Sequence, residues 1–304
     1  MLQAPQYRRP ALSPSELEER AAALALRHGE RVSGLEQAGR AQAALKAELQ
    51  AAMADEEQHI GLLDKLVALF VDQPHTPLLE SLTAHHEAAL ECVRALGHHI
   101  EALETDLRLL ERDLKELNRE HRDAWADASE AALALQRVQV ALSALNLRRK
   151  AQDNPDLSAQ ADDLEALLWE RGTEKRRFDA AAERLHGLAE LHRDLRLLLR
   201  AQHESLSRLH AAGTATLQGM SRHVATLRAA ASAKDLAEET ATAFEELKGS
   251  VARACDLADA STSTLSVHVD ALEQRMRTLD AEANERREAT LEVEKALERF
   301  RRWQ

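Results

Sequence analysis

The chain has 304 residues, of which 44% are hydrophobic, 30% are charged and only 3% are aromatic. Its ten glycines and six prolines are too few for the many turns of a sheet protein. The chain is instead rich in Ala, Leu, Glu, Arg and Gln, which lose little free energy on entering a helix. Composition therefore predicts an all-α fold and excludes sheet folds.

The formal net charge of -12 disfavours general binding to nucleic acid, because an acidic protein repels a phosphate backbone. The most apolar stretch, residues 60–71, carries Asp64 and Lys65 and is too short to span a bilayer. The N-terminus has Arg and Pro where a signal peptide has its apolar core, and two cysteines are too few for a disulfide framework. We therefore expect a cytoplasmic protein, and the excess of Arg over Lys is typical of a GC-rich bacterial genome.

Proline and capping residues mark the starts of four helices, because proline is tolerated in the first turn of a helix and not in its interior. Ser13-Pro14-Ser15-Glu16 is a capping box, and Thr76-Pro77 and Asn154-Pro155 repeat the pattern of a cap followed by proline. A weaker start follows Ser232. These signals predict a flexible leader over residues 1–12 and helices over about 14–72, 77–152, 155–231 and 233–302.

Apolar residues repeat at alternating steps of three and four along each segment. The stripe in the second segment persists for about nine heptads and is interrupted only by His86 and His121. The third segment slips at Gly213, and the first includes His28, Arg31 and Gln42, so we expect its first half to pack loosely or against another molecule.

The pattern predicts one elongated domain over residues 13–304, an antiparallel coiled coil or long four-helix bundle with up-down-up-down order. Alternatively, two hairpins complete the bundle only as a dimer.

Such a bundle would gather distinctive residues at its two ends. One end would be basic and could dock an acidic partner, anionic lipid headgroups or single-stranded nucleic acid, although the helix dipole by itself favours Arg and Lys in a last turn. The basic residues are Arg8, Arg9, Arg148, Arg149, Lys150, Arg301 and Arg302, and the aromatic Trp303 lies next to them in the sequence. The other end would be apolar and could contact a partner or a membrane, or form an ordinary packed end. Its residues are Leu62, Leu63, Leu66, Phe70, Leu78 and Leu79.

Glu56-x-x-His59 and Glu183-x-x-His186 have the spacing of di-iron carboxylate bundles, but so short a motif carries little information. Glu183 and His186 flank their apolar stripe and are expected to face outwards. Only Glu56, with His59 and His86, stays a weak metal candidate. Polar residues in a heptad stripe more often set register or oligomeric state, which is the simpler interpretation of Glu56, His86, His121, His192 and Gln202.

No sequence motif of a nucleotide-binding loop, nucleophile elbow or zinc protease occurs. We therefore expect no catalytic residue, cofactor or small-molecule substrate. The leading hypothesis is a non-enzymatic coiled-coil scaffold or adaptor that binds proteins and self-associates. The alternatives are a peripheral membrane or pore-forming protein that uses residues 62–79, and a metal-binding bundle of His and Glu ligands.

Overall fold

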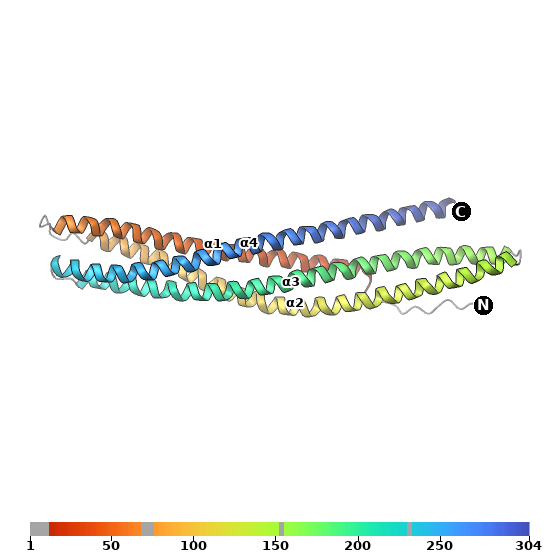
Figure 1. The fold of residues 1–304 in the computed structure, drawn as a ribbon, viewed down its shortest axis with the longest axis horizontal. Coiled ribbons are helices and arrows are strands. Elements are labelled where there is room, and N and C mark those ends of the chain that lie inside the picture. The colour runs from red at the N-terminus through yellow and green to blue at the C-terminus, as the bar shows by residue number, and fades with distance from the viewer. Residues whose placement is uncertain (1–11, 68–75, 152–154, 230–232, 304) are drawn as a thin grey trace. The chain divides into compact units, whose positions relative to one another are not determined.

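A computed structural model describes residues 12–67, 76–151, 155–229 and 233–303. Within these ranges the side chains of 59–67, 76–78, 151, 155, 227, 233–241, 297 and 300–303 are not described. The described chain forms four long helices and no strand: α1 (Pro14–Val67), α2 (Thr76–Ala151), α3 (Pro155–Ala229) and α4 (Ala233–Trp303) (Figure 1). The all-α fold is confirmed, and the helix bounds lie close to the expected ones.

The start of α1 shows why the helix begins at Pro14. The backbone N–H of Glu16 donates to the Ser13 hydroxyl at 3.3 Å, and the Glu16 carboxylate accepts from the Ser13 backbone N–H at 2.7 Å. These two bonds satisfy donors that lack partners in the first turn of a helix. The predicted capping box is confirmed.

The helices contribute to two compact units, and each helix has a stretch in both. Unit 1 consists of Met1–Gly29, Leu110–Asp194 and Leu272–Gln304, and unit 2 consists of Glu30–Leu109 and Leu195–Ala271. The expectation of a single domain stays a prediction.

In unit 1 the helices form a ring in which α1 and α3 each lie between α2 and α4. Side-chain pairs join the neighbours: Arg20–Glu120 (α1–α2), His121–His186 (α2–α3), Arg184–Asp280 (α3–α4) and Arg287–Glu18 (α4–α1). Numbers rise along one helix while they fall along its neighbour, as Arg20–Glu120 and Arg27–Asp113 show, so neighbours are antiparallel. The core of this unit packs Leu17, Leu24, Leu117 and Leu185 with Phe178, all fully buried.

Unit 2 repeats the arrangement with other residues. Its neighbouring pairs are Asp55–Ser81 (α1–α2), Glu104–His203 (α2–α3), Gln202–Ser261 (α3–α4) and Lys46–Asp259 (α1–α4). Glu48–His85 also joins α1 to α2. Compared with Asp55–Ser81, its residue number is lower on α1 and higher on α2, as in antiparallel helices. Each unit is therefore an up-down-up-down four-helix bundle in which α1 and α3 are diagonal partners.

Burial largely follows the heptad stripes, and it departs from expectation on α1, α3 and α4. His28, Arg31 and Gln42 are buried with the apolar residues of α1, which corrects the expectation that this part packs loosely. On α4 the buried stripe ends at Leu272, and beyond it Met276 and Leu279 are only half-buried. Among its described side chains, the last part of α4 is therefore only partly covered by the other helices.

Gly213, where the sequence predicts a slip of the stripe, lies at a close approach between helices. A Cβ atom on this buried residue would lie 2.9 Å from Val93 Cγ2 on α2 and 3.3 Å from Leu45 Cδ2 on α1. A β-branched neighbour on a helix has little rotamer freedom to move away. Glycine is therefore required where three helices meet. The expected slip is not seen in the burial of α3, because Leu209, Gly213, Thr216, Met220 and His223 are buried at continuous heptad spacing.

We expect Gly213→Ala to destabilise the protein and Gly249→Ala to stabilise it. Overpacking costs about 1–3 kcal/mol, more than the helix propensity that alanine gains. No atom lies within 4 Å of a Cβ at Gly249, so only the gain of about 0.5–1 kcal/mol remains there. Denaturant unfolding followed by circular dichroism measures both, and equal effects at the two positions would refute the close approach.

Candidate functional site

Ionisable side chains lie in the bundle interior between the diagonal helices α1 and α3. In unit 1 the rings of His28 and His192 are 5.2 Å apart, and the His192 Nδ1–H donates to the Leu188 carbonyl at 2.9 Å. In unit 2 the His223 Nε2 lies 2.5 Å from the Glu56 Oε1, and both side chains are at most 1% exposed. Each polar contact stabilises only one alignment of α1 with α3.

Two amide–hydroxyl contacts add to the polar interior of unit 2. The Thr262 hydroxyl donates to Gln42 Oε1 and the Ser261 hydroxyl to Gln202 Oε1, each at 3.3 Å. Both glutamines and Ser261 are buried. A buried amide without a partner would be costly, so these contacts favour one register of α4 against α1 and α3.

The polar residues expected in the heptad stripes differ in burial, and their role in setting register stays a prediction. Glu56, His192 and Gln202 are buried, whereas His86 and His121 are only half-buried. His28 and Gln42 were recognised as interruptions of the stripe, but their partners were not. His223 was missed because the expected stripe shifts at Gly213 and passes through Val224, whereas the buried residues Gly213, Thr216, Met220 and His223 keep the heptad spacing.

The weak metal candidates are not brought together among the described residues. Glu56 pairs with His223, while His86 Nε2 lies 2.8 Å from the Ser221 hydroxyl. His59 lies outside the described side chains. No group of three or more His, Cys, Asp or Glu side chains within the described part of the chain is placed to hold a metal ion.

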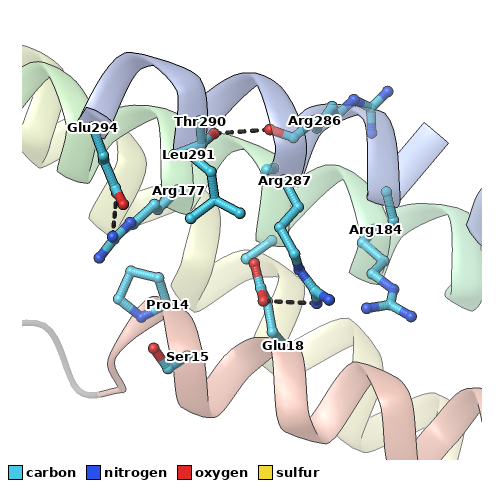
Figure 2. Close-up of a pocket in the computed structure, with 13 residues that line it drawn as sticks. Pro14, Ser15, Glu18, Arg177, Arg184, Arg286, Arg287, Thr290, Leu291 and Glu294 are labelled. Carbon is cyan, nitrogen blue, oxygen red and sulfur yellow. Dashed lines mark hydrogen bonds and ion pairs between the residues drawn. The ribbon is translucent and has the colours of Figure 1, made fainter. Parts of the chain in front are cut away.

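A hollow of about 210 Å³ lies in unit 1 beside the start of α1. Four arginines from α3 and α4 line it, and Figure 2 shows the Arg287 guanidinium turned toward Glu18 and the Arg177 guanidinium turned toward Glu294. Arg287 lies 3.0 Å from Glu18. The other two arginines also have carboxylate partners, Arg184 with Asp280 and Arg286 with Glu183.

These arginines join helices to one another. The hollow is smaller than the roughly 300–1,000 Å³ of a ligand pocket, and each guanidinium is already engaged by a carboxylate. Partly exposed ion pairs of this kind contribute little stability individually. We interpret the site as an ion-pair network that joins α3 to α4 and, through Arg287 and Glu18, the start of α1 to α4.

A second hollow in unit 1, of about 730 Å³, opens between α2, α3 and α4. It is lined by His121 and Trp125 of α2 and His186 of α3; the two imidazole rings are 5.1 Å apart and Trp125 is 6.5 Å from His121. Burial, followed by the nearby His186 and Arg193, lowers the pKa of His121, so its neutral imidazole is favoured. As expected, Glu183 and His186 face outwards.

Both cysteines are free thiols, and burial raises the pKa of Cys92 and of Cys255. A raised pKa keeps sulfur protonated at neutral pH, whereas a nucleophilic cysteine needs the thiolate. Neither residue has the electrostatic surroundings of a reactive thiol.

The outer face of α2 in unit 1 carries an apolar stripe that sequence reasoning missed. Leu133, Val140 and Leu147 are 54%, 64% and 70% exposed and follow one another at intervals of one heptad. Val138 and Leu145, each two residues before a member of this stripe, are buried, so the two sets lie on opposite sides of the helix. The seven-residue spacing was visible in the sequence, but only the structure separates the inward stripe from the outward one.

Most residues of the two expected ends lie outside the described side chains: Arg8, Arg9, Leu62, Leu63, Leu66, Phe70, Leu78, Arg301, Arg302 and Trp303. Arg148, Arg149 and Lys150 are exposed in the last turn of α2, and Leu79 is half-buried. Within the described ranges, none of the helices combines the length and apolar character needed to cross a membrane. Both proposed ends stay predictions.

Comparison with known proteins found no matching family model, no matching curated protein and no matching solved structure.

We expect Glu56→Ala to lower the free energy of unfolding by about 2–4 kcal/mol, because it leaves the buried His223 without its carboxylate partner. Replacing both residues, Glu56→Leu with His223→Leu, should restore most of the loss, since apolar residues of similar volume need no partner. Denaturant unfolding provides the measurement.

The adjacent residue is a matched control. Glu57 pairs with Lys248 at 3.0 Å on the surface, where both side chains are about half exposed, so Glu57→Ala should leave stability nearly unchanged. Similar effects of Glu56→Ala and Glu57→Ala would contradict the importance of the interior pair.

Proposed function

We propose that the protein is a non-enzymatic helical scaffold or adaptor that self-associates and binds other proteins along its helices. The outward apolar stripe of Leu133, Val140 and Leu147 is the observation that carries this proposal. Isolated exposed leucines are ordinary, but three apolar residues at heptad spacing form the surface on which another helix packs.

The charges around the stripe favour a second copy of the chain as its partner. Between Leu133 and Leu147 the only charged residue is Arg137. Acidic residues precede the stripe and basic ones follow it: Asp123, Asp127 and Glu130, then Arg148, Arg149 and Lys150. Two antiparallel copies of α2 centred on Val140 would therefore place Glu130 of each copy opposite Lys150 of the other, whereas parallel copies would oppose like charges.

The same antiparallel alignment matches the apolar residues. With Val140 opposite Val140 of the second copy, Leu133 lies opposite Leu147 of that copy, and both ends of the stripe are covered. A two-fold contact of this type uses the same surface on both chains, which is the usual geometry of a homodimer. The scaffold thus assembles through a helix that is already part of its own bundle.

The cellular setting that we propose is the cytoplasm of a bacterium. The free, protonated thiols of Cys92 and Cys255 are compatible with a reducing compartment. The Arg-rich composition supports a bacterial origin.

We expect the triple variant Leu133→Gln, Val140→Gln and Leu147→Gln to lower the solution mass from that of a dimer to that of one chain. Glutamine is a good helix former, so helicity should be retained while the apolar contact is lost. Light scattering coupled to size-exclusion chromatography over a range of concentrations gives the mass.

Leu197→Gln with Val267→Gln is the control, since these residues are 66% and 67% exposed on other helices and should not alter the mass. The proposal fails if the unaltered chain has the mass of one chain at every concentration, or if the triple variant retains the dimer mass.

A further inference from the structure

We propose that His121 and His186 together bind one divalent transition-metal ion, Zn²⁺, Ni²⁺ or Cu²⁺, on the surface between α2 and α3 of unit 1. This site is independent of the self-association proposed above, because none of the outward stripe residues lines it. It also differs from the metal candidates considered from the sequence, which involve Glu56, His59 and His86.

The spacing of the two rings fits shared coordination. Zinc–nitrogen distances are about 2.0–2.1 Å, so two imidazoles on one tetrahedral ion have ring centres about 5 Å apart. The rings of His121 and His186 are 5.1 Å apart, with planes tilted by 36°. The His186 Nε2 lies 3.5 Å from the Glu190 carboxylate, so shared coordination requires the rings to rotate until one nitrogen of each faces a common point, with water completing the coordination of the ion.

The charged groups around the two rings are of both signs. Neutral imidazole is the form that coordinates a metal. The hollow contains Glu183 and Glu282, and Arg286 is already paired with both carboxylates at 3.0 and 3.5 Å. The positive charge of Arg286 is therefore compensated, while Arg122 also lines the hollow and Arg193 lies near His121.

The backbone of the site supplies rigidity. His121 and His186 belong to long antiparallel helices, and elements of this type hold ligands in more constant positions than loops do. An ion bound to both rings would link α2 to α3 and stabilise the folded state through binding linkage. Imidazole favours zinc, nickel and copper, whereas calcium and magnesium favour oxygen ligands, so the latter two should not bind.

Trp125 provides a direct readout, because its ring lies 6.5 Å from His121 and is exposed in the same hollow. In the full chain, Trp169→Phe and Trp303→Phe leave Trp125 as the only tryptophan. Titration with Cu²⁺ should quench its fluorescence in a saturable manner at one ion per chain. Zn²⁺ should compete and restore the signal, and Mg²⁺ should not.

In that background, His121→Gln and His186→Gln should each weaken copper binding by more than about tenfold, since even residues behind metal ligands contribute about 10–100-fold. His98→Gln is the control, because His98 is on α2 with its side chain 81% exposed and should leave the titration unchanged. Circular dichroism without metal verifies that each variant is folded.

A second readout is Zn²⁺-dependent stabilisation: the ion should raise the unfolding temperature of the unaltered chain and of His98→Gln, but not of His121→Gln or His186→Gln. Absence of saturable quenching would overturn the site. So would quenching that is unchanged in both ligand variants, because the copper would then be bound elsewhere.

Discussion

The burial of one apolar stripe on every helix against the stripes of its neighbours is the constraint on which the rest of the structure depends. A long helix has little stability in water unless one face is covered. The residues that cover each face are mostly Leu and Ala with a single large aromatic, Phe178, in the core of unit 1. Because these side chains are small and similar, apolar packing alone would permit several alignments of the helices.

Polar residues inside the bundle restrict those alignments. His28 with His192 and Glu56 with His223 each connect α1 to α3, and sliding one helix by a turn would separate the partners. A buried polar group without a partner is costly, so wrong alignments are penalised more than the correct one is stabilised. Gly213 adds a steric constraint of the same kind, because only there can α3 approach Val93 and Leu45 so closely.

Two regions on the surface of unit 1, the outward stripe of α2 and the hollow between α2, α3 and α4, differ in chemical character. On α2 the outward stripe is apolar and nearly free of charge, which suits contact with another helix. Beside it along the same helix, His121 and Trp125 line a hollow together with His186 of α3, and carboxylates and guanidinium groups of both signs surround them. One long helix thus presents two chemically distinct surfaces, because its outer residues are not constrained by the core.

Sequence by itself determined the helical class, the capping box at Ser13 and the heptad stripe of α2, since these depend on residues close together in the chain. It also identified Glu56, His192 and Gln202 as residues of the stripe. Only the tertiary structure decided that Glu56 faces His223, that His121 faces His186 and that Gly213 lies against Val93. The physical reason is that periodicity defines the face of a helix on which a residue lies, whereas its partner depends on how the helices are aligned in space.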